Sequence, residues 1–293
     1  MSLIVTTEFE LSQVAAPNLP LATPQYDPRY IDQLNNVLRL YFNQLDKILA
    51  QLKTGVIDID GAGIQFPNGA FHQDGVTTLT TSFSNSSTAD IVVASTAQFQ
   101  TAGTILIDQE FIGYTGKTST TFTGITRNLY GTTSAAHTAG VYISEAQGVA
   151  SASTALAIPM DTTDVSNQVS FDPAHPSRIV FAVAGYYNIQ FSAQLINFTT
   201  TDDNVTFWYR QNGTDIPYSA GISQVLPKHG SLPGSAIISW NIVLPVDADD
   251  YVELMFASTT GNTVCSTYPP GTSPVTPTSP SVILTATFVS ALP

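Results

Sequence analysis

A heptad pattern near the N-terminus is the feature of this sequence that most restricts how the chain folds. The pattern predicts a helix over residues 27–54 whose apolar seam packs against copies of itself as a coiled coil. Asp27 suits the N-cap of this helix, Pro28 its first position and Gly55 its end. The seam residues follow one another at alternating spacings of three and four: Ile31, Leu34, Leu38, Tyr41, Leu45, Ile48 and Leu52.

A helix that packs on its own domain is the alternative interpretation of this pattern. Val37, Phe42 and Leu49 widen the apolar face beyond a strict seam, and a wide face suits either a trimer or a core helix. No second helix is predicted elsewhere in the sequence to cover that face. We therefore expect the helix to self-associate, with the chain forming a homotrimer.

Composition indicates a β protein with few solvating charges. The chain has 293 residues, of which 11% are charged, against about 25% in an ordinary soluble domain. Its formal net charge of −13 repels phosphates, which argues against a nucleic-acid partner and an anionic membrane surface. None of its apolar runs is long enough to span a bilayer, so membrane insertion is not expected. Many apolar residues are β-branched or aromatic and stand beside Thr and Ser, as in strands.

The single cysteine and the first residues of the chain indicate synthesis in a reducing cytoplasm. Cys265 is the only cysteine, so it cannot form an internal disulfide and the fold must be held by packing. Residues 1–13 lack both the basic segment and the long apolar segment of a signal peptide.

The first 26 residues predict an extended arm that docks on another protein. Three prolines interrupt any regular element, yet the segment is more apolar than an exposed tail usually is. A disordered tail is the alternative. The apolar residues that we expect to anchor the arm are Leu3, Val5, Phe9, Leu11, Leu19 and Leu21.

A connector rich in Gly, Ser and Thr is expected over residues 55–88. The spacing of Asp58 and Asp60 before Gly61 has a faint likeness to a calcium loop. The third acidic position and the closing Glu of such a loop are missing, so we interpret the segment as turns.

Short strands separated by turns fill the remaining sequence, which we divide into a small β module at 89–147 and a larger head at 148–293. The stretch 265–281 contains five prolines and is predicted to be a long loop. The expected strands are 91–95, 104–116, 121–127, 140–146, 155–160, 169–172, 177–184, 185–198, 204–213, 235–246, 250–259 and 281–289.

The small β module resembles a module found in structural proteins of tailed bacteriophages, over about 60 residues. Asn128 stands where the module usually has a glycine after Arg127. Glu110 and His137 have the residue types of a catalytic pair, but we favour a hydrogen bond that closes a loop. The matching residues are Gly103, Ile105, Ile107, Glu110, Ile112, Tyr114, Thr115, Gly116, Phe122, Thr123, Gly124, Ile125, Thr126, Arg127, Gly131, Thr132, Thr133, Ala136 and His137.

The head resembles the complement-globular-head and tumour-necrosis-factor superfamily. The segments that carry the resemblance are 181–192, 207–213, 250–254 and 281–289. The resemblance implies a jelly-roll β-sandwich and trimers whose inner sheets pack around the three-fold axis, which agrees with the heptad pattern. The expected fold class is therefore mainly β, with an arm, a coiled-coil helix, a small β module and a jelly-roll head.

Segments 15–22, 32–46 and 66–75 resemble virion proteins of marine tailed phages, especially those that infect cyanobacteria. This resemblance implies a non-enzymatic structural protein of the virion, made in the host cytoplasm. A trimeric fibre or spike with an outward head is the first expectation, and a capsid decoration or cement protein is the alternative. The implied partners are portal, neck, tail or capsid proteins, with a host surface glycan as a candidate ligand of the head.

The sequence contains no motif for catalysis, for a metal or for a cofactor, and none is expected. The four histidines lie far apart in sequence. Acidic residues gather at 202–203 and 247–250, which we interpret as solvated turns. A glycan-degrading tailspike is the enzymatic alternative, but it requires paired carboxylates in a groove. Aromatic residues that stack on sugars if exposed, although most are expected in the core, are Tyr186, Tyr187, Trp208, Tyr209, Tyr218 and Trp240.

Overall fold

The computed structural model describes residues 28–56 and 66–292. Contacts divide the chain into two units, residues 1–65 and 66–293, and each is described by itself. The predicted anchoring residues, Leu3 to Leu21, and the turns at Asp58 and Asp60 lie outside the described residues.

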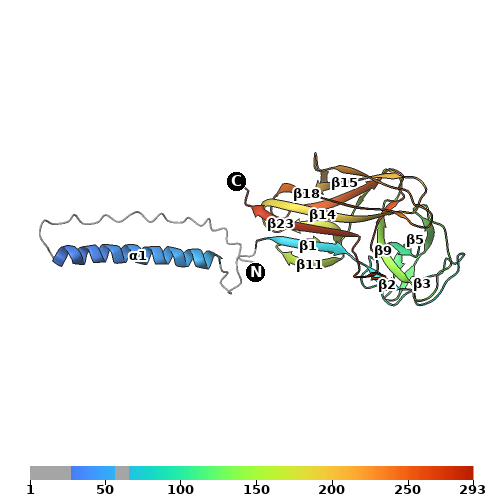
Figure 1. Cartoon of the computed structure of the whole chain (residues 1–293), viewed down its shortest axis with the longest axis horizontal. Helices are drawn as coiled ribbons and strands as arrows, with labels where there is room; N and C mark the ends of the chain where they lie inside the picture. Colours follow the sequence, from blue (N-terminus) through green and yellow to red (C-terminus); the bar gives the residue numbers. More distant parts are fainter. Residues whose placement is uncertain (1–27, 57–65, 293) are drawn as a thin grey trace. The chain divides into compact units, whose positions relative to one another are not determined.

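Helix α1 (Pro28–Val56) is one continuous helix (Figure 1). It begins at Pro28 as predicted, but it continues through Gly55, where we expected it to end. A glycine inside a helix costs only about 1 kcal/mol, so it does not by itself stop one. Of the predicted seam, Leu34, Leu38, Tyr41 and Leu45 are half-buried and Ile31 is exposed, while the side chains of Ile48 and Leu52 are not among those described.

Two antiparallel sheets form most of the second unit and enclose its largest apolar core (Figure 1). One contains β11 (Thr162–Asn167), β1 (Asn68–Gln73), β23 (Val282–Ser290), β14 (Gly185–Asn197) and β18 (Gly234–Val246). The other contains β12 (Val169–Asp172), β13 (His175–Phe181), β19 (Tyr251–Ser258), β15 (Asp203–Gln211) and β16 (Thr214–Asp215), with β10 (Ala155–Ala157) on β19 and β17 (Gly221–Val225) on β15.

Alternation along the strands explains this core. Successive side chains of a strand point to opposite faces of its sheet, so every second residue of β14 faces inward. Phe191 of β14 stacks on Phe207 of β15 with ring centroids 5.0 Å apart, and both are buried. The expected strand at 185–198 therefore corresponds closely to β14, and the mainly β prediction is confirmed.

A smaller group of strands continues the first sheet at the end away from β11. Strand β20 (Thr263–Ser266) pairs with β14 on one side and with β9 (Tyr142–Gly148) on the other. From β9 the sheet extends through β4 (Gly103–Ile107), β5 (Glu110–Tyr114) and β8 (Thr126–Leu129), with β2 (Val76–Thr78) also on β9. A separate three-stranded sheet contains β3 (Ile91–Val92), β7 (Thr121–Thr123) and β6 (Gly116–Lys117).

Two segments differ from the sequence-based expectation. Residues 68–73 and 76–78, expected within a connector, form β1 and β2. In β1, Phe71 and Gln73 are buried on one face, and the less buried Ala70 and His72 lie on the other. The predicted loop at 265–281 begins too early, since Cys265 belongs to the buried strand β20. All five prolines follow β20, where a short hairpin forms from β21 (Gly271–Thr272) and β22 (Val275–Thr276).

Candidate functional site

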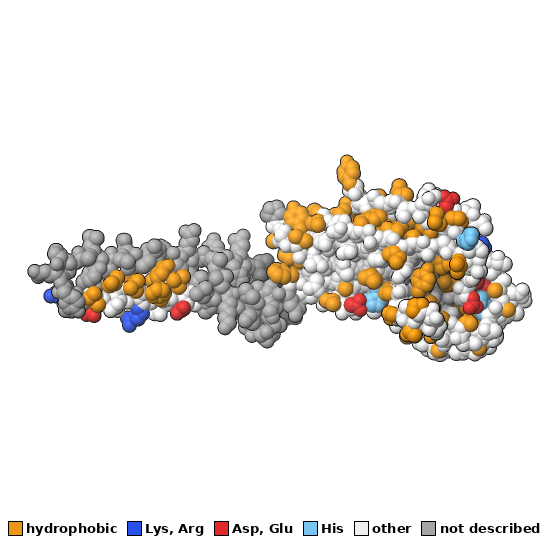
Figure 2. Space-filling view, in the orientation of Figure 1, with side chains coloured by type: hydrophobic (Ala, Val, Ile, Leu, Met, Phe, Trp, Pro, Cys, Tyr) orange, Lys and Arg blue, Asp and Glu red, His pale blue; other side chains and the backbone are white. Residues whose placement is uncertain are grey.

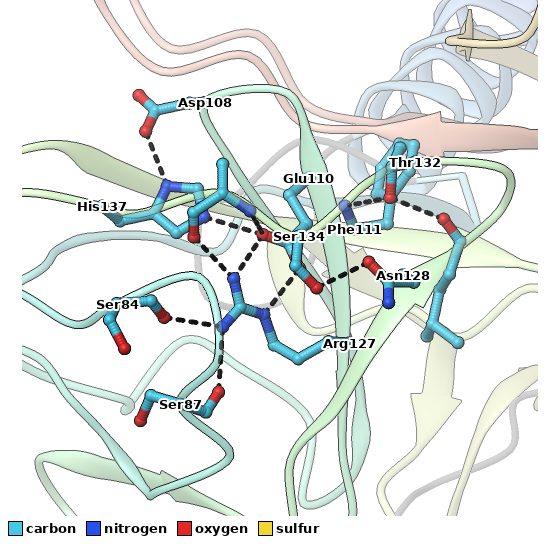
Figure 3. Close-up of polar contacts among 12 residues, drawn as sticks. Ser84, Ser87, Asp108, Glu110, Phe111, Arg127, Asn128, Thr132, Ser134 and His137 are labelled. Carbon is cyan, nitrogen blue, oxygen red and sulfur yellow. Dashed lines mark hydrogen bonds and ion pairs between the residues drawn. The ribbon is translucent and has the colours of Figure 1, made fainter.

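The densest group of charged contacts in the smaller group of strands is centred on Glu110 and Arg127 (Figure 3). Glu110 begins β5 and Arg127 lies on the neighbouring strand β8, so antiparallel pairing brings them together. Nε and Nη2 of Arg127 each donate to one carboxylate oxygen of Glu110 at 2.6 Å. This bidentate geometry matches the planar guanidinium to the planar carboxylate.

The remaining donors of Arg127 bind backbone carbonyls. Nη1 donates to the carbonyl oxygens of Ser84 at 3.2 Å and Ser87 at 2.9 Å, and Nη2 also donates to that of Ala135 at 2.7 Å. A guanidinium has five N–H donors, so this side chain is fully used. Arg127 therefore ties the segment at 84–87 and the loop at 131–137 to β5 (Figure 3).

His137 lies between two carboxylates, as Figure 3 shows. Its Nε2 is 2.9 Å from Oε2 of Glu110, and its Nδ1 is 2.7 Å from Oδ2 of Asp108. Its ring also packs against Phe83, with centroids 5.0 Å apart. The structure thus brings the predicted pair of Glu110 and His137 into contact, and the contact closes the loop at 131–137 onto the strands.

Electrostatics keep the Glu110 carboxylate ionised. Burial alone would raise its pKa, but hydrogen bonds from Arg127, His137 and the backbone N–H of Ala135 outweigh burial and hold the pKa below its usual value. The side chains of Glu110 and His137 are 0% exposed. A substrate in solution cannot reach either group without opening the loop. Glu110, Arg127 and His137 therefore cross-link the strands and the loop, and this group is called the tie below.

A shallow cleft of about 400 Å³ lies beside the tie. Its lining includes the exposed Asp108, the exposed Lys228 and the buried Phe198. Asp108 takes φ +53° at the hairpin between β4 and β5, so its carboxylate reaches both His137 and the rim of the cleft. With one acid and one base on its lining, the cleft has hydrogen-bonding groups but no second carboxylate that faces Asp108 across it.

A second polar anchor corrects the expectation of a solvated turn at 202–203. Asp203 begins β15 and is 2% exposed. Its carboxylate accepts hydrogen bonds from the hydroxyl groups of Ser258 and Thr259 and from the backbone N–H groups of Thr260 and Thr263. Burial alone would raise the pKa of Asp203, but these hydrogen bonds outweigh burial. They hold the pKa at about 2, below its ordinary value of 3.8. Asp203 thus fixes the turn between β19 and β20.

The other acidic group is closer to the expectation. Asp247 and Asp249 are exposed in the turn between β18 and β19. Asp250 accepts hydrogen bonds from the side-chain amides of Gln211 and Asn212, at 2.8 Å and 2.6 Å. It therefore joins this turn to the end of β15.

The candidate sugar-stacking aromatics divide between core and surface. Tyr187 and Tyr209 are 0% exposed and belong to the core, as expected. Tyr218 is fully exposed and takes φ +64° in the turn before β17. Trp240 packs edge-to-face on Phe191, and the indole N–H of Trp208 donates to Asp215. The structure does not gather these rings into one surface.

Sequence reasoning singled out Glu110, Arg127 and His137 but did not pair Arg127 with Glu110. The available signal was a lone Glu inside an apolar strand, which must find a cation if it is buried. Sequence reasoning missed Asp203 because an acidic pair before a strand has the same pattern in a solvated turn and in a buried anchor.

No group of three or more His, Cys, Asp or Glu side chains in the described part of the chain is placed to hold a metal ion. Over the same residues, no helix is both long enough and apolar enough to cross a membrane.

Comparisons with known proteins add no relative. A scan against protein-family models finds no match to the chain, and a search of curated protein sequences finds none.

Proposed function

We propose that this chain is a non-enzymatic structural protein of a tailed-phage virion, which forms a homotrimeric fibre or spike. In this proposal α1 trimerises the chain, residues 1–26 attach it to another virion protein, and a jelly-roll head projects outward, where it contacts the host surface. The virion assignment is supported by the sequence resemblances at 15–22, 32–46, 66–75 and 103–137.

The apolar stripe of α1 is the observation that carries the proposal. Leu34, Leu38, Tyr41 and Leu45 follow one face of the helix and are only half-buried. Phe42, which flanks this stripe, is 57% exposed. Within residues 28–56 and 66–292, α1 is the only α-helix, so no other described helix covers this stripe. Helices in proteins gain most of their stability by packing an apolar face, and two further copies of α1 would provide that packing.

The head has a second surface that suits burial against a copy. The outward positions of β14, β18 and β23 carry no Lys, Arg, Asp or Glu, and Figure 2 shows few charged side chains on the visible face of this unit. Cores of protein interfaces are likewise depleted of charge. These outward residues include Gln190, Ser192, Gln194, Ile237, Ser239, Asn241, Val243, Ile283, Thr285 and Thr287.

The tie at Glu110 supports a structural role over a glycan-degrading one. A glycosidase needs two carboxyl groups that flank an accessible bond. Glu110 is sealed by Arg127 and His137, and the cleft beside it has only Asp108 as an acid. A capsid decoration protein is the alternative within the structural class, and the attachment partner of residues 1–26 distinguishes it from a fibre.

The test places charges in the seam of the full chain. The double variant Leu38→Asp and Leu45→Asp introduces two carboxylates into each helix of the dry seam, where an unpaired charge costs several kcal/mol. The matched control, Asn36→Asp and Asn43→Asp, adds the same charge on the opposite face. Sedimentation should show that the seam variant dissociates while the control remains trimeric. If both variants assemble equally, α1 is not the trimerising element.

A further inference from the structure

A buried polar cluster lies where β9 meets the segment that leads into β11. Glu145 and Gln147 are two residues apart on β9, so their side chains share one face of the strand. Nε2 of Gln147 donates to the carbonyl oxygen of Pro159 at 3.0 Å. The backbone N–H of Asp161 donates to the carbonyl of His72 at 3.2 Å. These bonds place Pro159 beside β9 and Asp161 beside β1, where the carboxyl group of Asp161 lies near that of Glu145.

This cluster holds most of the unsatisfied polar atoms in the described residues. In the described residues, six buried side-chain nitrogen or oxygen atoms have no hydrogen-bond partner, and five of the six belong to this cluster. Native proteins pair nearly all such atoms, so a concentration of exceptions needs a cause. The five are Gln73 Nε2, Glu145 Oε2, Gln147 Oε1 and both carboxylate oxygens of Asp161.

The missing partner must be small. Oε1 of Glu145 accepts a hydrogen bond from the backbone N–H of Gln100 at 3.2 Å, but Oε2 has no donor. Oε2 lies against the backbone of Gly75, so closely that a Cβ added at Gly75 would be 2.6 Å from it. Glu145 is 1% exposed, and its carboxyl group is within hydrogen-bonding reach of that of Asp161.

We propose that Glu145 and Asp161 share one proton, and that this carboxyl–carboxylate pair is a pH-sensitive clamp between β9 and residues 159–161. The shared proton supplies one O–H donor, which pairs Oε2 of Glu145 with one of the two unpartnered oxygens of Asp161. When it is lost, two like charges face each other in a buried site, and their repulsion opens the contact.

The surrounding groups leave the pair short of positive charge. Lys117 is the cation that acts on Glu145, but its ammonium donates to the carbonyl oxygens of Thr96 and Phe99. The hydroxyl of Tyr114 donates to the carbonyl of Gln100. Of the remaining neighbours, Asp74 raises the pKa of Asp161 and His72 lowers it, and His72 itself lies between the carboxylates of Asp74 and Asp164.

Linkage gives the direction of the pH dependence. Burial, and for Glu145 the neighbouring Asp161, raise the pKa of both carboxyl groups, that of Glu145 well above its ordinary 4.5. The folded protein then binds more protons than the unfolded chain above that ordinary value. Stability therefore falls as pH rises from about 4.5 toward the raised pKa of Glu145. The clamp is closed in acid and released toward alkaline pH.

Cys265 reports the opening of the clamp. It is the only cysteine of the chain, it is 0% exposed, and it lies on β20 directly opposite Gln147 of β9. The experiment measures the rate at which a maleimide labels Cys265 in the full-length wild-type protein and in Glu145→Gln, at each pH from 6 to 9. Comparing both proteins at one pH cancels the pH dependence of the thiol chemistry.

The amide that Glu145→Gln introduces is neutral and donates to Asp161 at every pH, so the variant keeps the clamp closed. The wild-type rate divided by the variant rate should be close to one at pH 6 and rise at least tenfold by pH 9. Glu253→Gln removes a carboxyl group from β19 and is the matched control, which should label like the wild type. If Glu145→Gln does not fold, Asp161→Asn takes its place, and the infrared band of a protonated carboxyl in the wild type at pH 6 tests the shared proton directly.

A ratio that stays near one across the whole pH range, or the absence of that band, overturns the proposal. Slower labelling of the wild type at pH 9 when calcium is added, without an effect on Glu145→Gln, also overturns it, because the partner of the two carboxylates is then a cation.

Discussion

Arg127 and Glu110 meet through two parallel N–O contacts of 2.6 Å, with side chains that are 6% and 0% exposed. The pair joins β5 to β8, and its other hydrogen bonds reach the segment at 84–87 and the loop at 131–137. One ion pair thus holds four separate parts of the smaller group of strands.

Replacing Arg127 with Met should destabilise the fold strongly. Glu110 then stays buried with His137 and the Ala135 N–H as its partners. Breaking a buried ion pair by removing one partner costs about 3–5 kcal/mol. Chemical denaturation should show a lower midpoint. Arg210→Met is the control, because the Arg210–Asp215 pair is 27% and 56% exposed and should contribute less than about 1 kcal/mol. Equal losses in both variants would contradict a special role for the buried pair.

Asp203 should make the fold sensitive to acid. Its folded pKa of about 2 lies below its ordinary 3.8, so the unfolded chain binds more protons between these values. Stability from Asp203 is then present above pH 3.8 and is lost as pH falls toward 2. The loss is about 1–2 kcal/mol. Denaturation midpoints of the wild type and of Asp203→Asn, measured between pH 2 and 5, check this assignment. The midpoint of the variant should depend less steeply on pH than that of the wild type. Equal dependence on pH in both proteins would contradict the assignment.

Deleting residues 1–26 should separate attachment from assembly. The truncated chain retains α1 and the β unit, so we expect it to remain a folded trimer. Without the apolar anchoring residues it should fail to enter particles when it is the only copy supplied during infection. Mass spectrometry of purified particles measures this loss. Normal incorporation of the truncated chain would move attachment to the head.

Much of the fold was predictable because its signals are local. The alternation of apolar residues in 185–198 identified β14, and the same pattern identified β15, β18, β19 and β23. Strand β1 escaped prediction because its partners, β11 and β23, are distant in sequence and its own residues include a glycine. Strand β20 is only four residues long, and the proline-rich stretch that follows it obscured its pattern.

The polar sites were less predictable, because the residues that form them come from segments that are distant in sequence. Glu110 and His137 were recognised within a motif, yet only the pairing of β5 with β8 shows that Arg127 neutralises Glu110. Glu145 and Asp161 are 16 positions apart and were not identified at all, because no local pattern marks an acid that another acid will face. Charge pairing depends on register, which sequence spacing alone does not fix.

The mass of the full-length protein in solution tests the central claim most directly. Light scattering coupled to size-exclusion chromatography measures it without reference to shape. Self-association through α1 into a trimer predicts three times the 31.2 kDa mass of one chain, maintained at micromolar concentration. A stable species of 31.2 kDa at that concentration would contradict the account, because the apolar stripe of α1 would then need no second copy.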